Sequence, residues 1–156
     1  MSQVARDKEN YFSAYKLFAK SREDRDPAWL VRLREKAGAS FEQLDFPTTR
    51  HEEWKYTNVS PILKAPYSQD ADRGPIGTTA EQIEPFTFEE ASRNRLVFIN
   101  GIFSPELSNL VDLPGGVTAA NLAEPPAEHG KTISHHLATY AAYQDDAFTA
   151  LNTACI

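Results

Sequence analysis

The chain has 156 residues, enough for one domain with a buried core, and its apolar share of 41% and charged share of 24% are near globular averages. A net charge of -6 argues against a surface that tracks nucleic-acid phosphates, because such affinity depends on Lys and Arg, and the longest strongly apolar run, LVFI, is far shorter than the ~20 residues of a membrane span. One cysteine cannot form an internal disulfide and no secretory signal opens the chain, so we expect a cytoplasmic protein without nucleic-acid or membrane partners.

Two amphipathic helices are predicted at the amino end. Aromatic residues recur at helical spacing from about Gln3 to Lys20. A second helix follows Asp26-Pro27, a cap residue with a first-turn proline, and carries an apolar stripe from Trp29 to Leu44. Gly38 within it marks a bend or a close contact. The short charged turn between the helices predicts an antiparallel pair.

The stretch FPTTRHEEWKYTNVSPIL, residues 46–63, mixes rings, charges and prolines. Thr49 and Glu52 have the spacing of a capping box, which predicts a helical turn from about Arg50 to Tyr56. His51 as a general base oriented by Glu52 or Glu53 would have poor geometry, because adjacent residues point to different helix faces. We therefore interpret the stretch as structural, with Trp54 as its buried ring.

Period and composition change after residue 66. Residues 67–84 form a predicted linker rich in Gly, Pro, Ser, Thr and Asp. RLVFINGIF predicts a hairpin that turns at Asn100-Gly101, and short extended pieces surround PGG. Two short helices are expected in the tail, broken near residues 143–145. The sequence thus predicts an α+β fold with a helical region at 1–66, the linker, and a small α/β region at 85–156.

Few residues in the sequence are candidates for catalysis or metal binding. The conceivable soft-metal set lacks the tight ligand pairs of zinc sites, so we expect solvent-facing side chains and no metal or cofactor in this chain. Asp145-Asp146 is more typical of a helix start than of paired catalytic acids, and LPGGVT lacks the spacing of a nucleotide-binding loop. No catalytic residue is predicted. The set considered for metal is His129, His135, His136 and Cys155.

The order of the motifs resembles the amino-terminal region of SufD, in the SufB/SufD family of iron-sulfur cluster assembly scaffolds. PAWLVRLREKAGASFEQLDFPTTRHEEWKYTNVSPIL, RLVFINGIFSPELSNL, LPGGV and AFTALNTA occur in the same order. The resemblance implies a helical region that precedes a right-handed parallel β-helix, with SufB and SufC as partners in a SufBCD complex. The chain stops at LNTACI, about where the β-helix would begin, so the SufC contact is expected to be absent. Family-signature residues, without a known chemical role, are Arg50, Glu53, Trp54, Lys55 and Tyr56.

We therefore hypothesise a non-catalytic scaffold domain, not an enzyme. A contact surface could form from exposed rings at Tyr11, Tyr15, Phe18 and Trp29. One alternative is a free-standing adaptor module. The other is a small metal-binding hydrolase that uses the tail histidines and Cys155, and it predicts a tightly bound metal or a cysteine with a depressed pKa.

Overall fold

The computed structural model describes residues 3–65, 77–111, 113–122 and 125–156 and shows a mixed α+β fold, as predicted. The chain forms two compact units, one made of residues 1–68 with 130–156 and the other of residues 69–129. From their order in the chain, residues 130–156 were predicted to lie in one region with the strands. The structure groups them with the helices instead. Within the predicted linker at 67–84, residues 67–76 lie outside the described residues.

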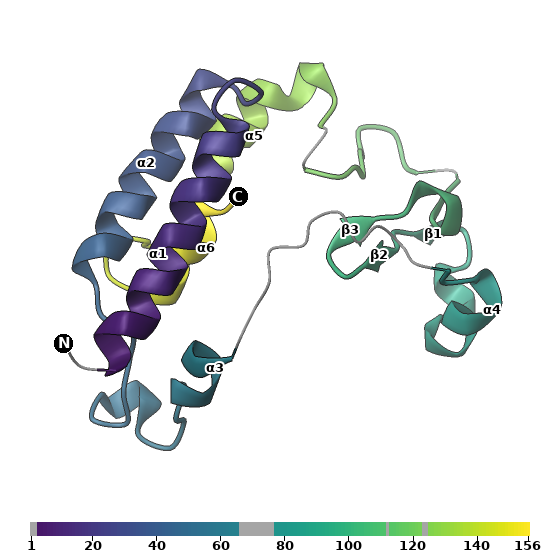
Figure 1. The fold of residues 1–156 in the computed structure, drawn as a ribbon. Helices are drawn as coiled ribbons and strands as arrows, with labels where there is room; N and C mark the ends of the chain where they lie inside the picture. Colours follow the sequence, from purple (N-terminus) through teal and green to yellow (C-terminus); the bar gives the residue numbers. More distant parts are fainter. Residues whose placement is uncertain (1–2, 66–76, 112, 123–124) are drawn as a thin grey trace. The chain divides into compact units, whose positions relative to one another are not determined.

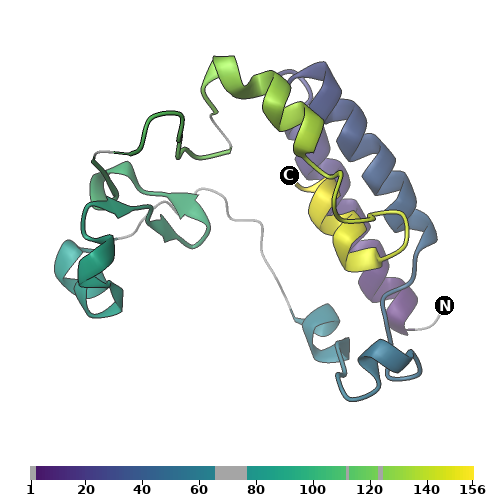
Figure 2. The ribbon, with the colours of Figure 1, turned by 180° about the vertical axis from the view of Figure 1, so that it is seen from behind.

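The predicted antiparallel helix pair is the frame of the first unit. Helices α1 (Gln3–Arg22) and α2 (Ala28–Gln43) lie side by side and run in opposite directions, and helix α6 (Ala147–Ala154) packs against α2 (Figures 1 and 2). Short helices α3 (Ser60–Lys64) and α5 (Gly130–His136) complete this unit, together with the 3-10 turn η1 (Glu52–Trp54).

Small residues on α6 allow it to approach α2 closely. Ala147, Ala150 and Ala154 recur at spacings of three and four, and each is almost completely buried. Phe148 lies near Phe46, whose ring also contacts Phe41, with centroid separations of 4.9 and 5.5 Å. The amino end of α6 therefore packs near the carboxyl end of α2, and the core contains residues from both ends of the chain.

A buried ion-pair network replaces the predicted cap of α2. Pro27 is the N-cap, and it makes no side-chain capping bond. Asp26 does not cap the helix because its carboxylate accepts hydrogen bonds from the guanidinium groups of Arg22 and Arg34. Arg34 also donates through Nε to the carbonyl oxygen of Ile156, at 2.6 Å. The network thus joins the turn before α2 to the segment after α6.

Gly38 marks a close contact, one of the two roles predicted for it. A Cβ atom at this position would lie 2.3 Å from the hydroxyl oxygen of Tyr15. That hydroxyl donates to the carbonyl oxygen of Arg34, at 3.1 Å. The missing side chain therefore allows α1 and α2 to share a buried hydrogen bond.

The second unit contains two small antiparallel sheets in its described residues. Strands β2 (Phe98–Ile99) and β3 (Ile102–Phe103) form the predicted hairpin, and Asn100 and Gly101 have φ values of 51° and 83°. Strand β1 (Asn94–Arg95) pairs with β4 (Asn109–Leu110). Before the strands lie α4 (Ala80–Ile83), η2 (Glu84–Phe86) and η3 (Glu89–Ala91); η4 (Pro105–Leu107) and η5 (Ala127–His129) come later.

The tail contains the two expected short helices, α5 and α6. The segment between them is longer than predicted and spans residues 137–146. Asp146 begins α6 as predicted, because its carboxylate accepts from the backbone amide of Thr149 at 2.7 Å. Within the described part of the chain, none of the helices is both long and apolar enough to span a bilayer.

Candidate interaction surfaces

The segment 46–63, here called the signature loop, is fixed to the first unit at both ends. Phe46 at its start, and Val59 and Leu63 near its end, are almost fully buried. The hydroxyl of Tyr11 in α1 donates to the carbonyl oxygen of Ile62 at 3.1 Å. Because the ends of the loop are held, its middle is presented on a rigid base.

The start of the loop differs from the predicted capping box. Thr48, not Thr49, supplies the hydroxyl, which accepts from the backbone amide of Arg50 at 3.3 Å. The backbone amide of Thr48 donates to Nδ1 of His51 at 3.0 Å, and His51 is the N-cap of η1 without a side-chain capping bond. This compact Thr48–His51 turn replaces the capping box, and the predicted helical turn is the 3-10 turn η1 followed by a bend.

Only one of the five signature residues is an anchor. The ring of Trp54 is half-buried and lies 5.8 Å from the ring of Phe148 in α6. Tyr56 is 92% exposed, and Nζ of Lys55 lies 5.7 Å from its ring centroid. Arg50 and Glu53 are also exposed. The signature loop therefore uses Trp54 for packing within the first unit and presents the other four side chains to solvent.

The rings predicted as a contact surface lie mostly against their own chain. Tyr15 is 7% exposed and packs inside the helical unit. Tyr11 is half-buried through its contacts with the signature loop. Phe18 and Trp29 are also half-buried, and the guanidinium of Arg34 lies 5.2 Å from the Phe18 ring. Helical spacing places such rings on one face but does not indicate what covers that face.

Two of the tail histidines have hydrogen-bond partners other than Cys155. His129 contacts the hydroxyl of Thr118 at 3.1 Å, whereas His136 contacts the hydroxyl of Tyr140. Among the described residues, no three His, Cys, Asp or Glu side chains form a group suited to a metal ion. Partial burial raises the pKa of the Cys155 thiol, and this effect is larger than the lowering caused by the positive charge of Arg34. The residue as a whole is exposed. A raised pKa is the opposite of the depressed cysteine pKa that the hydrolase alternative gives as one of its two marks.

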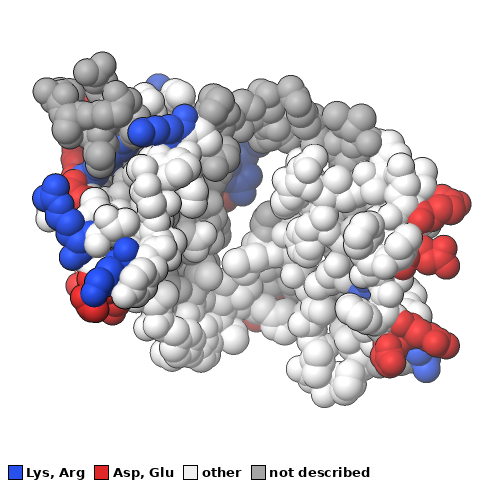
Figure 3. Space-filling view, turned by 90° about the horizontal axis from the view of Figure 1, so that it is seen from below, with Lys and Arg blue, Asp and Glu red and all other residues white. Residues whose placement is uncertain are grey.

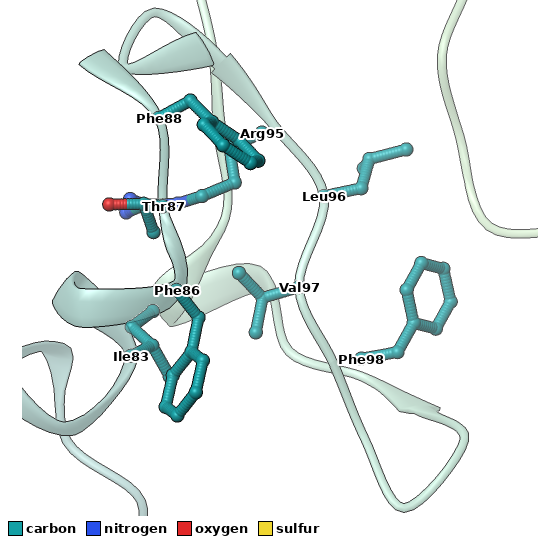
Figure 4. Close-up of a pocket in the computed structure, with 8 residues that line it drawn as sticks. All are labelled: Ile83, Phe86, Thr87, Phe88, Arg95, Leu96, Val97 and Phe98. Carbon is teal, nitrogen blue, oxygen red and sulfur yellow. The ribbon is translucent and has the colours of Figure 1, made fainter.

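An apolar pocket in the second unit was not anticipated from the sequence. Side chains from the end of α4, from η2 and the two residues after it, and from residues 95–98, which run from β1 into β2, line a cavity of about 310 Å³ (Figure 4). A sequence signal does exist, since Phe86 and Phe88 alternate with threonine between acidic residues in EPFTFEE. The principal lining residues are Ile83, Phe86, Phe88, Arg95, Val97 and Phe98.

Comparison with known proteins identifies the family. Residues 5–156 match the family model described as the SufBD protein N-terminal region. The chain belongs to the SufBD family. It is 33% identical, over 125 residues, to an iron-sulfur cluster assembly SufBD family protein of Synechocystis. That alignment covers 80% of this chain and 27% of the relative, so the chain spans about a quarter of the relative's length. No solved structure matches the chain significantly.

Proposed function

We propose that this chain is the amino-terminal region of a SufD-type subunit that serves as a non-catalytic scaffold in iron-sulfur cluster assembly. The family match over residues 5–156 is the observation that carries the proposal. The order of the signature loop, the NG hairpin and the AFTALNTA helix supports the SufD type within that family. The signature loop supports an interaction role, because buried anchors hold a solvent-exposed Tyr56 in place.

The proposed partners are SufB and SufC, in a cytoplasmic SufBCD complex formed by the longer family protein. We expect residues 1–156 alone not to retain SufC, because the resemblance places the SufC contact in a carboxy-terminal part that this segment does not include. In this proposal the segment contributes positioning and contacts, and the reactions of cluster assembly take place elsewhere in the complex.

Isolation of the endogenous protein tests the proposal. The protein would be tagged at its amino terminus in the source cells, purified under oxygen-free conditions, and examined by native mass spectrometry and peptide sequencing. Co-isolation with one SufB-type chain and the SufC ATPase supports the proposal. A protein that isolates without either chain overturns it and favours a free-standing adaptor.

Complementation distinguishes the SufD type from the SufB type. The endogenous gene would be expressed in two bacterial strains, one lacking SufD and the other lacking SufB, and activity of an iron-sulfur enzyme would be measured in extracts. Rescue of only the strain lacking SufD is expected. Rescue of only the strain lacking SufB would assign the chain to the other branch of the family. Strong retention of purified SufC by residues 1–156 alone would contradict the expected location of the SufC contact.

A further inference from the structure

The pocket of the second unit is surrounded by apolar side chains that solvent reaches. Phe86 is 84% exposed, Phe88 is 74% exposed and Phe98 is 49% exposed, yet all three line the same cavity. Figure 4 shows Phe86 and Phe88 on one segment and Phe98 on another, with the side chain of Val97 between them. Clustered exposed rings in a concave site are typical of surfaces that bind another molecule.

Acidic residues accompany these rings. Glu84 begins the η2 turn that carries Phe86, and Glu89 and Glu90 directly follow Phe88. All three acidic residues are exposed. Figure 3 shows groups of acidic side chains on this unit, with a basic side chain beside one of them and uncharged surface between them. An apolar patch with such a rim attracts a cationic ligand and repels an acidic one.

Arg95 forms part of the wall of the pocket. One terminal nitrogen of its guanidinium donates to the carbonyl oxygen of Leu107 at 3.3 Å. Its Nε has no hydrogen-bond partner among the described residues, but this atom has almost no surface open to solvent, so a ligand in the pocket does not reach it. The exposed rings and the neighbouring glutamates are therefore the groups that meet a ligand.

We propose that this pocket binds an extended, cationic peptide segment of a partner protein. Apolar side chains of the segment contact Phe86, Phe88 and Phe98, and its Lys or Arg side chains lie over the acidic rim. An extended segment suits this surface, because it places successive side chains on opposite sides of its backbone, so apolar side chains can contact the rings while the basic side chains between them extend toward the rim. This inference does not depend on whether the chain is of the SufD type.

A designed peptide tests the proposal with the full chain. The probe is a short, terminally blocked peptide that alternates lysine with leucine or phenylalanine, titrated into ¹⁵N-labelled protein and followed by NMR. Shifts are expected to concentrate in residues 83–98, with binding at least about tenfold tighter than for the same peptide with glutamate in place of lysine. Affinity should fall as salt is raised, because the rim charges are exposed.

Two variants connect the binding to the pocket. The double variant Phe86→Ser/Phe88→Ser should weaken binding at least about fivefold while the fold persists, since both rings are largely exposed. Tyr140→Ser, which removes an 81% exposed ring from the first unit, is the matched control and should bind as wild type. Glu84→Gln/Glu89→Gln, which leaves the rings in place, should reduce the preference for lysine over glutamate.

Three results would overturn the proposal. One is equal affinity for the lysine and glutamate peptides, or binding of neither. Another is unchanged affinity in both the ring and the rim variants. The third is a concentration-dependent shift of residues 83–98 without peptide, together with dimer formation in sedimentation, because a second copy of the chain would then occupy the pocket.

Discussion

The hydroxyl of Tyr15 occupies the space in which a side chain of residue 38 would begin. The close approach of α1 to α2 therefore depends on glycine at this position. The tyrosine is buried, and its hydroxyl is satisfied by the carbonyl oxygen of Arg34. Desolvation by burial raises the pKa of Tyr15, so the neutral form that donates this bond is favoured.

Gly38→Ala should destabilise the first unit by about 1 to 3 kcal/mol, because the new methyl group must displace a buried ring. Urea unfolding followed by circular dichroism measures the change. Gly115→Ala is the control, since a Cβ there meets no atom within 4 Å, and it should stay within about 0.5 kcal/mol of wild type. Equal stability of the two variants would show that Tyr15 has another position of similar energy.

Two guanidinium groups favour the charged form of the Asp26 carboxyl. Burial by itself would raise the pKa of this carboxyl, but hydrogen bonds from Arg34 and Arg22 outweigh burial and hold the pKa below its ordinary value of 3.8. A carboxyl with a lowered folded-state pKa stabilises the fold above the unfolded-state pKa and loses that contribution as pH falls through the folded-state value. The ion pairs therefore contribute fully at neutral pH and progressively less below about pH 4.

Asp26→Asn should cost about 3 kcal/mol at pH 7, because it leaves the buried Arg34 without its carboxylate. The difference from wild type should shrink as the pH falls below about 4, where the wild-type carboxyl also loses its charge. Urea unfolding of both proteins at neutral and acidic pH measures this difference and cancels the titration of the other acids. A difference that does not change with pH would argue against the ion pairs as its source.

Single-residue roles were predictable where the deciding partner is close in sequence. The capping role of Asp146 follows from the amide three residues later, and the hairpin at Asn100-Gly101 follows from positive φ values. The role of Asp26 as a helix cap was predicted wrongly. Whether its carboxylate accepts from helix amides or from guanidinium groups depends on the burial of Arg34, which also contacts Ile156 in the segment after α6. The arginine reaches Ile156 across 122 positions, a contact that no local pattern indicates.

At the scale of elements, the signature loop has one ring that packs against α6 and another that is exposed to solvent. Trp54 contacts Phe148 in α6, while Tyr56 two positions later is almost fully exposed. Periodicity predicted α1, α2 and α6, because each has an apolar face at helical spacing. The Thr48–His51 turn was not predictable, since two adjacent threonines are candidates for the capping position and the sequence does not choose between them.

Trp54→Ala should destabilise the first unit by about 1 to 2 kcal/mol, because a half-buried aromatic contact with α6 is lost. Amide hydrogen exchange in residues 48–58 should become faster, as measured by mass spectrometry. Tyr56→Ala is the matched control and should leave stability and exchange unchanged, since its ring is 92% exposed. Faster exchange in both variants would mean that the loop is not held by Trp54.

At the scale of the molecule, helix α6 from the tail packs against the pair of helices α1 and α2. Sequence indicated the α+β class and the family signature, but it placed residues 130–156 beside the β region because chain order was the available guide. The small residues of α6 pack against the buried face of α2, and periodicity does not reveal which faces of two helices meet. The pocket was missed for the same reason, as it combines residues 83–88 with residues 95–98.

Truncation after residue 129 should therefore unfold the first unit. Removing α6 exposes Phe41 and Ala37, both completely buried in the structure, and loses the Arg34 contact with Ile156. Far-ultraviolet circular dichroism should show a large loss of helix, and a synthetic peptide of residues 130–156 should restore it. A truncated protein with unchanged helix content and urea midpoint would contradict the role given to α6.

The contact between Arg34 and Ile156 has a consequence during protein synthesis. At typical rates of translation, the 122 positions between these residues take on the order of ten seconds to add. During that interval the first two helices leave the ribosome with Phe41 uncovered, and a chaperone or a neighbouring nascent chain can bind there. Substitutions that slow docking of α6 should therefore reduce the yield of folded protein in cells more than equilibrium stability measured on the purified protein would suggest.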